Sequence, residues 1–136
     1  MKLVRKLTCE EWLLGRVKLA TAVQKSLEKS SGTLGLFQLD LEVMRGEQTV
    51  FGLFNDSELV CLVVGKHVVY HNEMQVFFVL LAAGELTKHT DLVDEMCAIV
   101  KTEGAQFVEA WAGTPEAKLY SRVGFEPTRV VLRKQL

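Results

Sequence analysis

The sequence predicts an α/β domain in which a central mixed sheet of about six to seven strands carries helices on both faces. Segments with the two-residue period of strands alternate along the chain with segments that have the period of helices. Met74–Leu81 is apolar on both faces, as expected of a strand that is covered on both sides. The chain has 136 residues, 49% of them apolar, and contains no linker or repeat. Residues 1–136 are therefore expected to form a single domain.

The N-terminal half is expected to begin with a short strand at Lys2–Leu7 and a helix after it. Thr8 and Glu11 have the spacing of a capping box, which predicts the start of this helix. A single apolar stripe continues the helix to about residue 28, with Leu13, Val17, Ala20, Val23 and Leu27 at helical spacing. Residues 33–46 fit both a strand and a helix, and we assign them to a helix.

The rest of the chain is expected to alternate strands and helices. A hairpin is predicted because Asn55-Asp56-Ser57, which tolerates left-handed backbone, separates the strands Thr49–Phe54 and Glu58–Val64. Lys88–Glu103 has an apolar face and is followed by Gly104, which is typical of a helix and its C-terminal end. The remaining elements are a strand at Gln106–Trp111, a helix at Pro115–Val123 and a last strand at Val130–Lys134.

Composition narrows the functional class. Sixteen basic and seventeen acidic side chains give a net charge of −1, which argues against a dedicated binder of nucleic acid or anionic membrane. The longest apolar run, Val76–Gly84, is too short to span a bilayer, and the N-terminus lacks the apolar core of a signal peptide. The three cysteines and three histidines form no ligand spacing, so no metal site or disulfide framework is expected. We therefore expect a soluble cytoplasmic protein with reduced thiols.

The segment TPEAKLYSRVGFEP carries a resemblance to the GNAT superfamily of N-acetyltransferases. The last helix of that family usually begins with Asn, contains Ala and ends in Leu-Tyr followed, after three residues, by Gly-Phe. Here Ala117, Leu119, Tyr120, Gly124 and Phe125 stand in that order, and Thr114 takes the place of the asparagine. The order of strands and helices extends the resemblance loosely over the whole chain.

The resemblance implies an acyl-CoA-dependent N-acetyltransferase that moves an acetyl group from acetyl-CoA to an amine of a small molecule or protein. In the family, the fourth and fifth strands separate, the pantetheine arm binds in the gap, and the pyrophosphate rests on the N-terminus of the following helix. A tyrosine at the position of Tyr120 would protonate the departing thiolate. Glu73 or Glu109 would deprotonate the amine, and the sequence leaves both carboxylates open.

The pyrophosphate loop departs from the family pattern Gln/Arg-x-x-Gly-x-Gly/Ala. The usual helix length places the pattern at Gly84–His89, where Thr87 and His89 replace the two small residues. A second register, Val79–Gly84, keeps two small residues but would shorten the central strand. The resemblance therefore implies these cofactor-binding residues: Val79, Leu80, Leu81, Gly84, Thr87, Lys88, His89 and Thr114.

The altered loop leaves a second interpretation open. A catalytically inactive protein of the same fold could serve as a binding or structural module, such as a phage virion-associated or host-interaction protein. The edge strand Val130–Lys134 could pair across a homodimer, so a monomer or a homodimer is expected. Trp12, Trp111 and Phe125 are expected to be buried aromatic residues.

Overall fold

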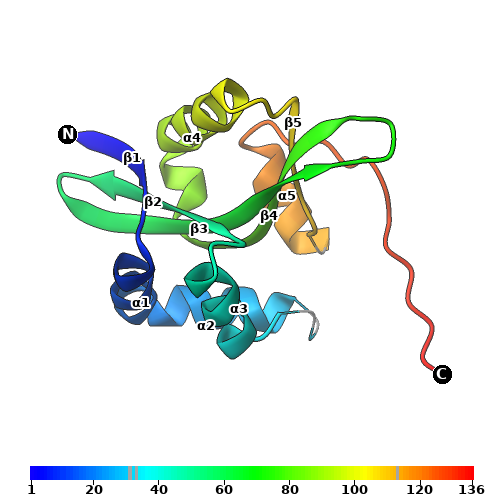
Figure 1. The fold of residues 1–136 in the computed structure, drawn as a ribbon, viewed down its shortest axis with the longest axis horizontal. Helices are drawn as coiled ribbons and strands as arrows, with labels where there is room; N and C mark the ends of the chain where they lie inside the picture. Colours follow the sequence, from blue (N-terminus) through cyan, green and yellow to red (C-terminus); the bar gives the residue numbers. More distant parts are fainter. Residues whose placement is uncertain (31, 33, 113) are drawn as a thin grey trace.

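One mixed sheet of five strands crosses the molecule (Figure 1), and the strands lie side by side in chain order. This computed structural model describes residues 1–30, 32, 34–112 and 114–136, with only the backbone at 114 and 115. The strands are β1 (Lys2–Lys6), β2 (Thr49–Asn55), β3 (Glu58–Val69), β4 (Gln75–Gly84) and β5 (Phe107–Ala110). Neighbours from β1 to β4 pair antiparallel, whereas β4 and β5 are parallel. The predicted mixed α/β class is confirmed, and the described residues form five strands where six to seven were expected.

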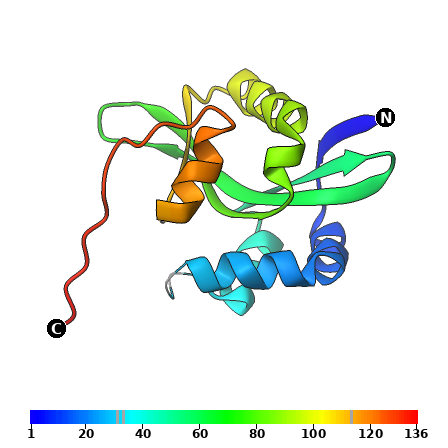
Figure 2. The same cartoon turned by 180° about the vertical axis from the view of Figure 1, so that it is seen from behind.

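Helices cover both faces of this sheet, as Figures 1 and 2 show from opposite sides. One face carries α1 (Cys9–Lys18), α2 (Ala20–Lys29) and α3 (Leu36–Met44), and we call it the α1–α3 face. The other carries α4 (Thr90–Thr102) and α5 (Thr114–Ser121), and we call it the α4–α5 face. No helix in the described ranges is long and apolar enough to cross a membrane.

Side chains that alternate along the strands form a separate core on each face. The core on the α4–α5 face joins Phe51, Val63 and Phe77 to the apolar side of α4. The core on the α1–α3 face joins Val64 and Leu81 to Trp12, which is fully buried as predicted. The central strands thus carry apolar residues on both sides, which explains their continuous apolar sequence.

The predicted single helix between Thr8 and about residue 28 is wrong in one respect, since the chain breaks it at Leu19. The capping box is confirmed, because the Glu11 amide donates to Thr8 Oγ1 over 3.2 Å and the Thr8 amide donates to Glu11 Oε1 over 3.0 Å. Leu19 leaves the helical region with φ −102° and ψ 32°, so α2 starts a new axis. An apolar stripe can face the core along its whole length only if the helix has a single axis, and α1 and α2 have two. Val17, which was predicted to face the core, is 67% exposed.

The helix predicted for residues 33–46 is present as the shorter α3, Leu36–Met44, and residue 33 lies outside the described residues. The predicted last strand, Val130–Lys134, is wrong. Residues 130–136 have no regular structure and extend away from the body of the protein (Figure 1), and Val130 and Leu132 are 82% and 89% exposed. Valine favours strands only where a neighbouring strand supplies hydrogen bonds and packing, and no such partner accompanies this segment in the described chain.

Candidate active site

The parallel strands β4 and β5 pair over four residues and then separate. Pairing runs from Val76 opposite Phe107 to Val79 opposite Ala110, whereas β4 continues to Gly84. At this point β4 has a bulge: Gly65 of β3 lies opposite Val79 and Val64 opposite Leu81, which leaves Leu80 as an extra residue. Beyond the bulge, β4 makes no pair with β5 in the described chain. Part of its backbone edge there is already occupied, because Ser26 Oγ of α2 donates to the Ala82 carbonyl over 2.8 Å.

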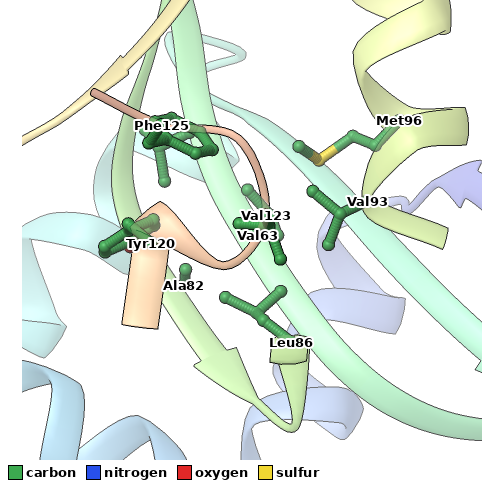
Figure 3. A pocket seen from close by; sticks show the side chains of 9 residues that line it. Val63, Ala82, Leu86, Val93, Met96, Tyr120, Val123 and Phe125 are labelled. Atoms are coloured by element: carbon green, nitrogen blue, oxygen red, sulfur yellow. The ribbon is translucent and has the colours of Figure 1, made fainter. Parts of the chain in front are cut away.

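Tyr120 lies on the α4–α5 face of this separation. Its ring contacts Phe125 edge to face, with centroids 5.2 Å apart. Figure 3 shows Tyr120 beside Ala82 of β4, at the wall of an apolar cavity that Leu86 and Val123 also line. Burial, and then the nearby charge of Glu116, raise the pKa of Tyr120 above its usual value. The phenol therefore keeps its proton at neutral pH and can donate it.

The cavity beside Tyr120 has a volume of only about 20 Å³. This is roughly the space of one water molecule. An extended ligand between β4 and α5 therefore requires α5, or the 3-10 turn η1 (Leu86–Lys88), to shift outward.

Glu109 lies on the opposite, α1–α3 face of the same separation. Its neighbours Val108 and Ala110 pack against the core of the α4–α5 face, so the carboxylate points the other way. Glu109 Oε1 accepts a hydrogen bond from the Tyr70 hydroxyl over 2.5 Å, and Oε2 lies 3.8 Å from Arg129 Nη2. The hydrogen bond to Glu109 is the largest cause that raises the pKa of Tyr70. The carboxylate is a proton acceptor one residue from the end of the β4–β5 pairing.

The structure does not bring Glu73 to this place. Glu73 lies in the turn between β3 and β4, with φ 63° and an amide that donates to the Tyr70 carbonyl. It is exposed and precedes β4, whereas the bulge lies at Leu80, in the second half of that strand. The geometry therefore favours Glu109 over Glu73 as the carboxylate of the site. Tyr70 and Arg129, which hold Glu109, carry no sequence motif, and only the fold reveals them.

The segment between β4 and α4 is the candidate phosphate-binding segment. The first register, Gly84–His89, spans the end of the strand, η1 and the residue before the helix. The second register, Val79–Gly84, would place the phosphate-binding pattern inside β4, because all six residues belong to that strand. The side chains of Val79 and Leu81 fill the two cores, so only their backbone can serve a ligand.

Two basic side chains, Lys88 and His89, stand at the N-terminus of α4. Lys88 is exposed and lies 3.2 Å from Glu85. His89 precedes the helix, and its Nδ1 is buried without a hydrogen-bond partner in the described chain. Thr87 lies in η1 between them and the strand. These groups and the helix dipole suit an anion, although Thr87 and His89 carry side chains where the family has none.

Two further expectations concern the end of β5 and the start of α5. Thr114 is the first residue of α5, and its side chain lies outside the described part of the chain. Trp111 was expected in the core, but it is 65% exposed and contacts Phe78 with ring centroids 5.4 Å apart. Trp111 follows the last residue of β5, Ala110, and is therefore outside the part of the sheet that helices cover. Phe125 is half-buried against Tyr120.

Gly84 is required by the sheet itself. Its φ is +117°, and a Cβ atom there would lie 2.2 Å from the Val60 carbonyl oxygen of β3. This close approach accounts for the glycine without any contact to a phosphate.

We expect Gly84→Ala to lower the free energy of unfolding by about 1–3 kcal/mol, because it adds backbone strain and a clash. Urea denaturation measures the loss. The matched control is Gly124→Ala, which has φ +92° but no neighbour within 4 Å, so it reports the backbone strain alone. Equal losses in the two variants would contradict the contact with β3.

Comparison with known proteins gives a consistent result at the level of fold. No family model matches the sequence, and no curated protein has significant sequence similarity to it. Among solved structures, a ribosomal-protein-alanine N-acetyltransferase from Brucella melitensis biovar Abortus matches with TM-score 0.70 and 14% identity, over 99% of this chain and 100% of that chain. An aminoglycoside acetyltransferase from an uncultured soil metagenomic sample matches with TM-score 0.67 and 17% identity, over 100% and 99%.

A third similar structure was solved with acetyl-CoA. It is a predicted acetyltransferase from Clostridium acetobutylicum, with TM-score 0.63 and 12% identity over 99% of this chain and 96% of that chain. All three similarities extend over nearly the whole of both chains, so the described domain corresponds to theirs from end to end.

Proposed function

Since the chain has the GNAT acetyltransferase fold, we propose that it is an acyl-CoA-dependent N-acetyltransferase that transfers an acetyl group from acetyl-CoA to an amine. The observation that carries the proposal is the separation of β4 from β5 at the Leu80 bulge, with Tyr120 on one face and Glu109 on the other. A proton donor and a proton acceptor on opposite sides of one opening are the two groups that aminolysis of a thioester requires.

In the proposed reaction the amine nitrogen attacks the thioester carbonyl carbon. The C–N bond forms, the C–S bond breaks, and sulfur leaves with the bonding electron pair. Glu109 accepts the proton that the amine loses, directly or through a water molecule. Tyr120 donates its phenolic proton to the thiolate and regains one from solvent, and Glu109 releases the proton that it accepted to solvent, so protons balance over one turnover.

The residues around the opening fit acetyl-CoA in two places. The pantetheine amides would pair with the backbone of β4 beyond Leu80, where Ser26 Oγ now donates to the Ala82 carbonyl over 2.8 Å and would have to give way or share that acceptor. Lys88 and the start of α4 supply positive charge for the pyrophosphate, and His89 Nδ1, which has no partner in the described chain, offers a hydrogen bond. Because side chains replace the loop glycines, we propose that the phosphates are held by these side chains more than by the backbone.

Acetyl-CoA is expected to stabilise the protein against heat. A ligand at about 100 times its Kd adds about 2.7 kcal/mol, which raises the Tm of a domain of this size by about 5 °C or more. Differential scanning fluorimetry with millimolar acetyl-CoA measures the shift, and adenosine 3′,5′-bisphosphate, which lacks the pantetheine arm, should give less. Lys88→Ala should reduce the shift, whereas Lys25→Ala, exposed on the α1–α3 face, should leave it unchanged. The absence of any shift at millimolar acetyl-CoA would refute the proposal.

A specific observation favours a second candidate, a catalytically inactive module of the same fold. The place of the pantetheine arm holds a cavity of about 20 Å³, and the loop glycines are replaced by Thr87 and His89. Such a protein would serve a partner macromolecule, for example in a phage particle or on a host protein. The same thermal titration separates the candidates, because the module predicts no shift.

A further inference from the structure

A second cavity, about 150 Å³ in volume, lies on the α1–α3 face between α3 and the sheet. Leu34, Leu39 and Leu80 give it apolar walls, and Leu80 is the residue of the bulge. A cavity of about this size holds a molecule as large as benzene. The cavity therefore borders the point where β4 leaves β5, on the face that carries Glu109.

Gln48, which also lines this cavity, has a buried oxygen that nothing in the described chain satisfies. The residue is 7% exposed, its Nε2 donates to Glu42 Oε2 over 3.3 Å, and its Oε1 has no hydrogen-bond partner. Rotating the amide would turn Oε1 toward the carboxylate and place two acceptors together, so Glu42 fixes the orientation. Buried polar atoms nearly always make a hydrogen bond, so we expect a hydrogen-bond donor to occupy the cavity next to Gln48 Oε1.

The cavity also has one charge of each sign. Glu42 supplies the carboxylate, and Lys66 of β3 supplies an exposed ammonium group on the same wall as Leu80. A ligand complementary to this arrangement has an ammonium group, a carboxylate and a short apolar body.

We propose that this cavity binds a small zwitterionic amine, such as an amino acid with a short apolar side chain. The ammonium group donates to Gln48 Oε1 and to the Glu42 carboxylate, the ligand carboxylate pairs with Lys66, and the apolar part contacts the three leucines. The binding itself requires no acetyl transfer. Its meaning as the acceptor position of a transferase rests on the proposed function.

The test uses three probes that differ by one group: valine, isobutylamine, which lacks the carboxylate, and isovalerate, which lacks the ammonium group. Each is titrated to about 20 mM into the ¹⁵N-labelled full chain without acetyl-CoA, and amide shifts are followed by NMR. Valine is expected to bind best, isobutylamine more weakly and isovalerate least. The largest shifts are expected around Gln48 and Leu80.

Two variants assign the contacts. Gln48→Met keeps the length of the side chain, removes the oxygen, and is expected to weaken isobutylamine binding about tenfold, as for the loss of a hydrogen bond to a charged group. Lys66 is exposed, so Lys66→Met should fold normally. It should weaken the binding of valine and leave the affinity for isobutylamine unchanged. Gln24→Met is the control, because Gln24 donates to Glu28 over the same 3.3 Å but on the surface.

The result that overturns the proposal is a lack of saturable shifts from valine and isobutylamine, which would mean that water alone satisfies Gln48. Shifts that map away from the cavity, or equal binding of the three probes, overturn it as well. If Gln48→Met does not fold, the Lys66→Met comparison decides alone. Because acetyl-CoA is left out, a failure here is distinct from a failure of the transferase proposal.

Discussion

Replacing Tyr120 by phenylalanine is expected to lower kcat for acetyl transfer by about 100-fold or more, in the range of general acid catalysis. The hydroxyl is the only group lost, and it makes no hydrogen bond within the described chain. The ring keeps its contact with Phe125, so the free energy of unfolding should change by about 0.5 kcal/mol or less. Release of free thiol from acetyl-CoA, measured with an amine acceptor, gives kcat, and urea denaturation gives the stability.

Tyr70→Phe is the informative companion, because it removes a phenol hydroxyl from the other face, where it donates to Glu109. Tyr70→Phe should slow the deprotonation of the amine and lower kcat by less than Tyr120→Phe does. A Tyr120→Phe protein that keeps its full kcat would remove the general acid from the mechanism. A loss of folding together with activity would instead identify Tyr120 as a packing residue.

Replacing Trp12 by alanine is expected to cost about 3–5 kcal/mol of folding free energy, which is a large part of what a domain of this size has. Trp12 is fully buried, and its indole Nε1 donates to Asp40 Oδ1 over 2.8 Å. Arg16 binds the same carboxylate through Nε and Nη2. The truncation thus opens a cavity and removes one of the contacts that tie α1 to α3. Urea denaturation followed by circular dichroism measures the loss.

Trp111→Ala is the matched control, because it deletes the same side chain at a site that is 65% exposed. It should cost about 1 kcal/mol or less. If Trp12→Ala leaves too little folded protein, Trp12→Phe keeps a ring in the core and should still lose the hydrogen bond to Asp40. Equal costs for the two alanine variants would contradict the burial of Trp12.

The sequence predicts best where one local pattern determines one element. The capping box of Thr8 and Glu11, the hairpin around Asn55 and the doubly apolar β4 are local signals, and the structure contains all three. The break at Leu19 has no such signal, because the apolar spacing continues across a change of helix axis. Val130–Lys134 has strand-forming residues but no partner strand beside it, and pairing is a property of the fold.

The candidate site divides in the same way. The Leu-Tyr and Gly-Phe pairs of the last helix pointed to Tyr120, and the structure places Tyr120 at the β4–β5 separation. Which of Glu73 and Glu109 lies near it depends on the register of β4 and β5, which the sequence does not contain. Gln48 was missed because a lone glutamine before a strand has no signature. Gln48 matters because its side chain is buried and hydrogen-bonded to Glu42, and both properties arise only when the chain is folded.

The bulge in β4 has a consequence for how this sheet is constructed. Val79 and Leu81 already sit opposite consecutive residues of β3, so Leu80 is supernumerary in that ladder. Excising this single residue would join Val79 directly to Leu81 and leave both side chains on their present faces, because the two already lie on opposite sides of the sheet. The irregularity of this ladder thus resides in one additional amino acid, at the same place where the pairing with β5 stops.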